Sequence, residues 1–387
     1  MWGSQNIFSL SDKKMVKILF SICGIGLGHA TRCHAIINEF LKHKDVELKV
    51  LSYGSGYKYL KEQGVDCQEI GGYEYKGEFT FSVLLSILDS IRDPTKLQRD
   101  YYDFLNVVEN FKPDIVLSDT EPNAFFYAYK RSIPNYILTN LISVLNNYPL
   151  IPQKYITRDI LMQQFMIDRL IDFMKKRGNR FYVPTFEQKV RYMDNVVYTD
   201  IIVRKKPSEM PSQEELKQKL GIDRDFYYVS VGGAEIEKYL FYIFEKILPT
   251  FKDKYFIISS NNLTDKVIEK DNMKIIPFIP NAIDYISLSK GVIAPAGHST
   301  ISEAICFKKP ILAIPVRNHI EQLTNAALLQ KEGFGKPCYL DQKGVFETIK
   351  NCIEQFFAEE KQINSNLNSA RPSGFGAMQI VRDILSR

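Results

Sequence analysis

The chain has 387 residues, of which 45% are hydrophobic and 25% charged, an ordinary composition for a globular protein that excludes extensive disorder. A chain of this length is longer than a domain with a single hydrophobic core usually is, so we expect two domains. The net charge of +5 is compatible with an anionic substrate or membrane surface but does not indicate a nucleic-acid partner.

Other global features favour a cytoplasmic protein. The six cysteines are scattered without C-x-x-C pairs, which argues against structural zinc and for a reducing compartment. No apolar run reaches the ~18 residues of a transmembrane helix. Residues 1–14 lack the apolar core of a signal peptide, and we expect them to form a flexible leader.

The first predicted unit is a strand, a glycine-rich turn and a helix. The apolar run Val16–Ile22 leads into GIGLGHATR, and the helix runs to about Lys42. A dinucleotide site would need G-x-G-x-x-G here, and the second strand, Glu47–Ser52, would need an acid at its end. Neither is present, so the pattern disfavours NAD.

His29 directly follows Gly28 in this turn. An imidazole has a pKa near 7, which suits a general base that removes a proton from a hydroxyl. The alternative is that His29 caps the helix or binds backbone.

A second polar site follows the buried strand Ile115–Leu117. Asp119 lies at its carboxyl end and could orient a histidine base, as in catalytic triads. The alternative is a helix N-cap, which aspartate also suits. Glu121 is a weaker candidate for the orienting role.

Two stretches of the first domain are rich in large apolar side chains, Tyr73–Phe104 and Ile160–Arg177. One interpretation is that they belong to the core. The other is a hydrophobic acceptor groove or a face that docks on an anionic membrane. Cations accompany the second stretch: Arg158, Arg169, Lys175, Lys176, Arg177 and Arg180.

A polar segment with two prolines, residues 204–212, marks the domain boundary. We place the first domain at 15–204 and the second at 205–372. The second opens with the strand Phe226–Val231, and Gly232 and Gly233 follow it. A glycine pair lets backbone approach phosphates, although a tight turn would use it equally.

The stretch from Gly291 to Gly335 carries the clearest chemistry. A strand (Val292–Ala294) ends in a turn at Gly297, and a helix follows in which Thr300 and Glu303 have capping-box spacing. The amides of this helix N-terminus suit a phosphate.

A second strand, Ile311–Val316, leads to the neighbouring pair Glu321 and Gln322, whose side chains suit hydroxyl recognition. Ligands of open α/β sheets bind at such carboxyl ends. Together, a diphosphate site and a hydroxyl site predict a nucleotide sugar.

These motifs resemble those of a known family. GHSTISE, KPILAIP and EQLTNAALL look like the donor-binding signature of GT-B glycosyltransferases, and GLGHATR resembles their N-terminal motif. The nearest resemblance is to UDP-glycosyltransferases and the lipid II-forming N-acetylglucosaminyltransferase of peptidoglycan synthesis. It spans almost the whole chain. It implies an α/β protein with two Rossmann-like, doubly wound domains that face each other across a cleft.

The resemblance also implies roles for individual residues. His29 becomes the general base and Asp119 its orienting partner, while Glu303 binds ribose and Glu321 and Gln322 bind the sugar. The remaining implied donor-binding residues lie in the glycine turns, the 278–279 segment that reads uracil, and the later helices: Gly28, Gly232, Gly233, Phe278, Ile279, Gly297, His298, Ser299, Thr300 and Asn325.

One position departs from the pattern. Plant UDP-glycosyltransferases carry a phosphate-binding histidine two residues before the glycine, where this chain has Pro295. His298 follows the glycine instead, which is nearer the lipid II-type pattern. The resemblance further implies that a helix at 373–387 returns to the first domain.

The sequence therefore predicts an inverting glycosyltransferase that moves a sugar from a UDP-sugar to a hydroxyl, with a lipid-linked or cell-envelope precursor as one acceptor class. We find no D-x-D metal motif and expect no metal and no cofactor. Peripheral contact with the cytoplasmic face of an anionic membrane would fit such an acceptor. The alternatives are a UDP-sugar 2-epimerase of the same fold and a non-catalytic nucleotide-sugar-binding scaffold.

Overall fold

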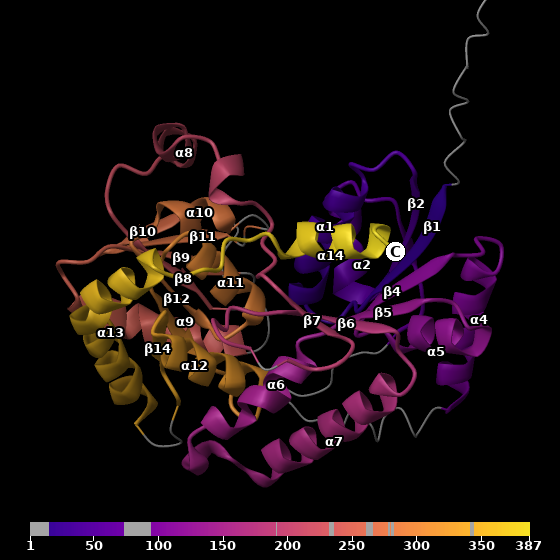
Figure 1. Ribbon diagram of the computed structural model, residues 1–387. Coiled ribbons are helices and arrows are strands. Elements are labelled where there is room, and N and C mark those ends of the chain that lie inside the picture. Colours follow the sequence, from indigo (N-terminus) through magenta and orange to yellow (C-terminus); the bar gives the residue numbers. More distant parts are fainter. Residues whose placement is uncertain are drawn as a thin grey trace, which may run out of the picture.

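The computed structural model describes residues 15–72, 94–190, 192–231, 236–260, 266–277, 279, 282–340 and 344–387. It contains two α/β domains side by side, one built from the first half of the chain and one from the second (Figure 1). Five predicted features lie wholly or mostly outside the described residues: the leader at 1–14, the apolar stretch Tyr73–Phe104 as far as residue 93, Gly232, Gly233 and Phe278.

The first domain is built on a parallel sheet whose described strands run in the order β3-β2-β1-β4-β5-β6-β7. The strands are β1 (Val16–Ile22), β2 (Val46–Ser52), β3 (Cys67–Glu69), β4 (Ile115–Asp119), β5 (Asn135–Leu138), β6 (Arg180–Pro184) and β7 (Val196–Thr199). A parallel sheet needs a crossover between paired strands, and helices on its faces bury it. This explains why β1 and β4 read as continuous apolar runs.

Helices provide these crossovers. They are α1 (Gly28–Phe40), α2 (Gly54–Glu62), α4 (Pro94–Val108), α5 (Pro122–Arg131), α6 (Leu141–Asn147) and α7 (Arg158–Lys175), with the 3₁₀ turns η1 (Tyr148–Leu150) and η2 (Gln153–Tyr155) before α7. None of the helices in the described ranges is both long and apolar enough to cross a membrane.

The second domain repeats this plan with the described strands in the order β10-β11-β9-β8-β12-β13-β14, parallel except for β10. The strands are β8 (Tyr227–Ser230), β9 (Phe256–Ser260), β10 (Ile268–Lys270), β11 (Met273–Pro277), β12 (Gly291–Pro295), β13 (Ile311–Ile314) and β14 (Gly335–Pro337). The helices are η3 (Pro207–Glu209), α8 (Gln213–Leu220), α9 (Ile236–Ile247), η4 (Leu248–Thr250), α10 (Ile283–Leu288), α11 (His298–Cys306), α12 (Ile320–Glu332) and α13 (Val345–Asn368).

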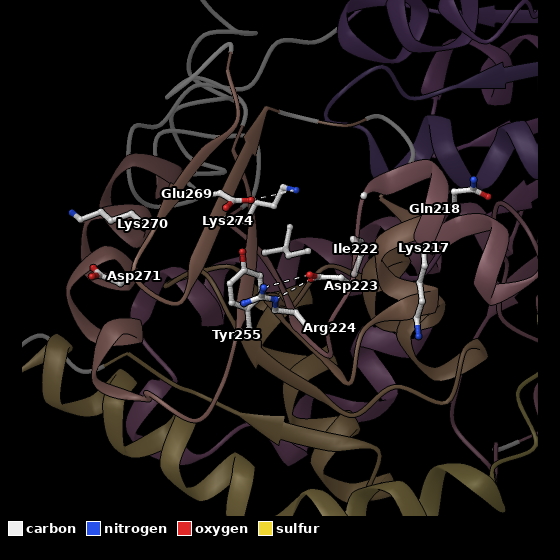
Figure 2. A pocket seen from close by; sticks show the side chains of 12 residues that line it. Lys217, Gln218, Ile222, Asp223, Arg224, Tyr255, Glu269, Lys270, Asp271 and Lys274 are labelled. Atoms are coloured by element: carbon white, nitrogen blue, oxygen red, sulfur yellow. Dashed lines mark hydrogen bonds and ion pairs between the residues drawn. The ribbon is translucent and has the colours of Figure 1, made fainter.

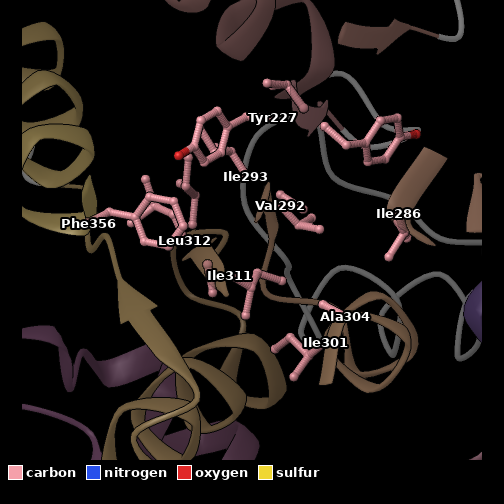
Figure 3. Close-up of a cluster of buried hydrophobic side chains, with 14 of the residues drawn as sticks. Tyr227, Ile286, Val292, Ile293, Ile301, Ala304, Ile311, Leu312 and Phe356 are labelled. Carbon is pink, nitrogen blue, oxygen red and sulfur yellow. The ribbon is translucent and has the colours of Figure 1, made fainter. Parts of the chain in front are cut away.

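Apolar side chains from these strands and helices form one core under the second sheet (Figure 3). Val292 and Ile293 of β12 and Ile311 and Leu312 of β13 are fully buried there, as are Ile301 and Ala304 of α11. α11 is therefore held firmly against the sheet, and its N-terminus has a fixed position at the sheet edge.

The last helix, α14 (Gly376–Leu385), returns to the first domain. It lies beside α1 (Figure 1), and Ala377, Ile380, Val381 and Ile384 are buried in the core of that domain. Ile202 also forms a β-bridge with Phe375 just before α14. The chain thus crosses between the domains twice, near residue 203 and near residue 372.

Both strand orders create a crevice at the carboxyl ends of the strands. In the first sheet the chain proceeds outward from β1 to β2 on one side and from β4 to β5 on the other, so β1 and β4 flank a switch point. In the second sheet β8 and β12 do the same. Ligands of doubly wound sheets bind at such points. The predicted two-domain, doubly wound fold is confirmed.

Candidate functional site

The turn between β1 and α1 brings backbone segments unusually close. A Cβ on Gly24 would stand 1.8 Å from the carbonyl oxygen of Tyr53, so only glycine fits. Gly26 has a φ of +68°, which also favours glycine. These glycines serve local packing, which explains why their spacing differs from a dinucleotide motif.

His29, on the first turn of α1, contacts Asp119 at the end of β4. His29 Nδ1 lies 3.0 Å from Asp119 Oδ1, and the imidazole is 27% exposed while the carboxylate is fully buried. Arg32, one turn further along α1, also binds Asp119, with Nε donating to Oδ2 at 2.8 Å and a second close contact from its terminal nitrogen to Oδ1. Cys33 Sγ donates to Oδ2 at 2.9 Å.

The charge of Asp119 decides which nitrogen of His29 carries its proton. Burial alone would raise the pKa of Asp119, but Arg32 and His29 outweigh it and hold that pKa well below its usual range. A carboxylate can only accept hydrogen bonds, so the 3.0 Å contact with Asp119 favours a proton on Nδ1, although a terminal nitrogen of Arg32, which can only donate, lies 3.1 Å from the same atom. Nε2 then carries the lone pair and faces away from Asp119, as a general base requires.

The chain turns sharply after Asp119. Thr120 has a left-handed φ of 51°, and Glu121 then caps α5, its side chain accepting from the amides of Asn123 and Ala124. Ser21 also donates to Glu121, at 3.0 Å. The N-cap alternative for Asp119 is therefore wrong, because Glu121 occupies that position. Glu121 is committed to the cap and does not contact His29.

The N-terminus of α11 differs from the capping box that the sequence suggests. The helix begins at His298, two residues before Thr300, and its N-cap is Gly297, which makes no side-chain cap hydrogen bond. The capping-box expectation for Thr300 and Glu303 is therefore wrong. A Cβ at Gly297 would meet no described atom within 4 Å, so there is room beside the first-turn amides.

The two helix N-termini meet between the domains. Ser299 Oγ on α11 donates to the carbonyl oxygen of Gly28 at 3.2 Å, and Thr31 donates to the same oxygen at 3.1 Å. A Cβ on Gly28 would lie 3.6 Å from Ser299 Oγ. The positive ends of α1 and α11 therefore approach one another, an arrangement that favours an anion between them.

His298 lies at the same interface. Its ring is 5.7 Å from that of Phe186, its Nδ1 is 3.3 Å from Ser302 Oγ, and it hydrogen-bonds the Pro184 carbonyl of the first domain. Burial, aided by the charge of Arg32, lowers the pKa of His298 to about 4. His298 is therefore neutral at pH 7 and packs the domains together.

Glu303 is buried and paired with Arg204 from the segment that joins the domains. Arg204 Nε donates to Oε1 at 2.7 Å, and its terminal nitrogen donates to Oε2 at 2.9 Å, a bidentate ion pair. Glu303 is 4% exposed. Within the described part of the chain each oxygen accepts one hydrogen bond from Arg204, and a carboxylate oxygen has a further lone pair.

Glu321 lies at the start of α12, near Arg32 and three histidines. Burial would raise its pKa, but His319, His29, Arg32 and His298 together lower it. Asn140 of the first domain donates to Glu321 Oε1 at 3.4 Å. His29 and Arg32 are among the groups that act on its charge, so Glu321 lies at the same part of the domain interface as the His29–Asp119 pair.

Gln322 and Asn325 anchor the backbone. Gln322 Oε1 accepts from the amide of Val316 at 3.0 Å, which closes the loop between β13 and α12. Asn325 is 5% exposed and donates to the carbonyl of Ala296 at 3.1 Å, which ties α12 to the turn before α11. Ile279 is partly buried against the core of the second domain.

Three polar residues of the site were absent from the sequence prediction: Arg32, Arg204 and Asn140. Arg32 had a signal, since it lies three residues after His29 on one helix face. Arg204 and Asn140 had none, because their partners are 99 and 181 residues away along the chain.

The described residues contain no group of three or more histidine, cysteine, aspartate or glutamate side chains placed to hold a metal ion. A cavity of about 670 Å³ lies outside the cleft, between α8 and the β10–β11 edge (Figure 2). Its charges are largely paired among themselves, as in Arg224 with Asp223 and Lys274 with Glu269. It has no connection with His29.

A cavity of about 200 Å³ is lined by both domains, and its lining includes Lys154, Thr157, Arg317, Asn318 and Tyr339. It lies at the loop that leads to Glu321, next to the candidate site.

Comparisons with known proteins agree with this geometry. The family model described as glycosyl transferase family 1 matches residues 16–212 and 238–354. An uncharacterized glycosyltransferase of Methanosarcina acetivorans is 28% identical, over 93% of this chain and 94% of its own.

A second relative, from Bacillus thuringiensis, is UDP-N-acetylglucosamine–N-acetylmuramyl-(pentapeptide) pyrophosphoryl-undecaprenol N-acetylglucosamine transferase 3. It is 22% identical over 91% of this chain and 95% of its own.

Among solved structures, Phytolacca americana UGT2 complexed with UDP-2fluoro-glucose and pterostilbene superposes with a TM-score of 0.69, at 12% identity, covering 96% of this chain and 99% of that one. The match in fold accompanies the family match over most of the sequence. The chain belongs to glycosyl transferase family 1 and is a glycosyltransferase of the GT-B type.

Proposed function

We propose that this glycosyltransferase moves a sugar from a UDP-sugar to an acceptor hydroxyl with inversion and without a metal ion. The observation that carries the proposal is the placement of His29, oriented by Asp119, opposite the N-terminus of α11. A base and an anion site on facing helix ends are what a single displacement at a sugar carbon requires.

His29 acts as the general base in this mechanism. Nε2 takes the acceptor hydroxyl proton as the acceptor oxygen forms its bond to C1 of the sugar and the bond from C1 to the diphosphate oxygen breaks. The buried carboxylate of Asp119 holds the ring and stabilises the imidazolium that forms. Arg32 keeps Asp119 ionised, so the carboxylate remains an acceptor for Nδ1–H.

The leaving UDP carries a developing negative charge on its diphosphate. The first-turn amides of α11, from His298 through Thr300, lack intrahelical acceptors and stabilise that charge, whereas the N–H of Gly297 donates to the carbonyl of Pro295. The N-terminus of α1, which Ser299 contacts through the carbonyl of Gly28, adds to the positive potential from the other side. This electrostatic arrangement gives a reason why the reaction needs no metal.

The donor's hydroxyls are assigned to two carboxylates. Glu303 accepts from the ribose hydroxyls with the lone pairs that Arg204 leaves available. Glu321, whose pKa His319, His29, Arg32 and His298 lower against the effect of burial, accepts from the sugar hydroxyls. The side-chain oxygen of Gln322 accepts from the amide of Val316 and so holds the loop before α12. The side-chain nitrogen of Gln322 is the group assigned to a sugar hydroxyl. Relatives support UDP as the carrier, since UGT2 was solved with UDP-2fluoro-glucose.

The acceptor domain has an exposed apolar stripe that suits a membrane surface. On α7, Leu161, Met162 and Phe165 are exposed on one side, Phe165 by 62%, and Leu170 is exposed further along the helix. Cations lie on and near this helix, as the sequence indicated, and would attract anionic lipid. Co-flotation with liposomes containing anionic lipid, and its loss in Phe165→Ser, is the expected result. No flotation of the parent protein would remove membrane docking from the proposal.

The donor is tested with a panel of UDP-sugars and UDP. Binding raises the melting temperature by mass action, so the panel identifies the preferred sugar. Incubation of that sugar nucleotide with hydroxyl acceptors should release UDP and yield a glycoside. Conversion to its 2-epimer would favour the epimerase alternative, and binding without turnover would favour a scaffold.

A further inference from the structure

Gln163 of the first domain binds the loop of the second domain that leads to Glu321, the carboxylate assigned to the sugar. We call its two hydrogen bonds to the backbone of Asn318 and Ile320 the clamp. Gln163 lies on α7 and is 2% exposed. Its Nε2 donates to the carbonyl oxygen of Asn318 at 2.7 Å, and its Oε1 accepts from the amide of Ile320 at 3.2 Å. One buried amide side chain thus binds two backbone groups on either side of His319, across the domain interface.

The loop between β13 and α12 needs this support. Asn318 has a left-handed φ of 55°, which costs conformational energy for a residue other than glycine. Ile320 is the first residue of α12, so its N–H has no intrahelical acceptor. Gln163 supplies that acceptor and fixes the Asn318 carbonyl at the same time.

Other contacts hold the same segment against the first domain. Thr157 Oγ1 donates to Asn318 Oδ1 at 3.0 Å, and Asn318 Nδ2 donates to Asp159 at 3.4 Å. A small apolar cluster that includes Ile160, Ile320 and Leu323 lies beside them. The polar contacts are specific in direction, whereas the apolar contacts tolerate sliding, so the bidentate amide sets the position of the backbone.

We propose that Gln163 is a positioning residue that sets Glu321 for the donor sugar. Glu321 follows Ile320 directly, so a shift of the Ile320 amide moves the carboxylate. The inference rests on the proposed function, because the sugar-binding role of Glu321 belongs to it. It adds that sugar recognition by the second domain depends on a side chain of the first domain. The two hydrogen bonds of Gln163 exist only while the two domains are in contact.

The consequence is selective for the sugar. UDP is assigned to α11 and Glu303, which Gln163 does not contact, whereas the sugar is assigned to Glu321. Loss of the two Gln163 hydrogen bonds therefore lowers the affinity for a UDP-sugar and leaves the affinity for UDP unchanged. A residue that only stabilised the fold would weaken both ligands together.

The test compares Gln163→Met with Gln164→Met. Methionine keeps the length of the side chain and removes both hydrogen bonds, and Gln164 is the half-buried neighbour on the same helix. In Gln163→Met the dissociation constant of the preferred UDP-sugar should rise about tenfold while that of UDP changes less than about twofold. In Gln164→Met neither should change. Equal weakening of both ligands, or no change in either, would overturn the inference.

Amide hydrogen exchange tests the clamp without any donor. In the parent protein the Ile320 amide should be protected although it lies at a helix start, and Gln163→Met should remove that protection while Gln164→Met keeps it. Rapid exchange of Ile320 in the parent protein would overturn the inference. If the parent fails to bind any UDP-sugar while Ile320 is protected by Gln163, the proposed function fails and the clamp remains.

Discussion

His29 and Arg32 share the buried carboxylate of Asp119, and this shared contact defines the chemistry of the residues at the site. The Asp119 side chain contacts His29 and Arg32 at once and also accepts from Cys33 and from the hydroxyl of Thr120. A carboxylate has lone pairs for all of them. Arg32 balances its charge permanently, and His29 does so only when the imidazole is protonated.

Replacing Arg32 by methionine should cost about 3 to 5 kcal/mol of unfolding free energy, because it leaves a fully buried carboxylate without its cation. Chemical denaturation at pH 7 measures this. Arg169→Met is the control, since Arg169 pairs with Asp168 on the exposed face of α7 and should change stability by less than about 1 kcal/mol. Equal effects of the two substitutions would contradict the buried-pair account.

His298 predicts a pH dependence of stability. Its pKa is about 4 in the folded protein, below the value of about 6.5 for an unfolded chain, so the unfolded state binds the proton first. Unfolding free energy should therefore fall as pH is lowered from about 6.5 to about 4, by up to ~1.4 kcal/mol per pH unit. Denaturation curves at pH 7 and 5 should show a smaller difference in His298→Gln than in the parent. An unchanged difference would refute this assignment.

At the scale of elements, the site depends on how α11 and α12 are joined at the sheet edge. Asn325 on α12 satisfies the Ala296 carbonyl in the turn before α11. This contact fixes the helix whose amides are assigned to the diphosphate, although Asn325 itself is buried in the second domain.

Asn325→Leu should lower the free energy of unfolding by about 1 to 3 kcal/mol, because a buried carbonyl loses its donor. It should also weaken UDP binding, measured by calorimetry, since the turn before α11 loses its anchor. Gln330→Leu, at an exposed position of the same helix, serves as the control and should change neither. UDP affinity that is unchanged in a destabilised Asn325→Leu would show that this turn does not shape the donor site.

The sequence predicted these elements well where apolar periodicity was strong. β1, β4, β12 and β13 are short buried runs, and their carboxyl ends carry the polar residues that were expected there. The helix start at α11 was missed because Thr300 and Glu303 have capping-box spacing while Glu303 forms an ion pair with Arg204 instead. The pairing of His29 with Asp119 was implied by the family resemblance, and it forms because β1 and β4 are neighbouring parallel strands. Contacts such as Gln163 with Asn318 depend on domain packing that no local pattern encodes.

For the whole molecule, α14 joins the end of the chain to the core of the first domain. Ile380 is fully buried in that core, whereas Met378 on the same helix is 42% exposed. The contact gives the two domains a second connection besides the segment around Arg204. The relative position of the facing helix ends therefore depends on α14 as well as on the interface.

Ile380→Ala should lower the free energy of unfolding by about 2 to 5 kcal/mol through the cavity it leaves. Met378→Ala should change it by less than about 0.5 kcal/mol. Thermal and urea denaturation of the two variants measures the contrast. Similar values for both would mean that α14 contributes little to the first domain.

The central claim is that an imidazole of one domain activates the acceptor while the other domain holds the nucleotide. The most direct measurement is UDP release from the preferred UDP-sugar by His29→Ala, with UDP affinity determined on the same sample. We predict that turnover falls by about 10²- to 10⁴-fold, the usual contribution of a general base, while the dissociation constant of UDP stays within about twofold of the parent value. Turnover that survives the substitution within about tenfold would contradict the account.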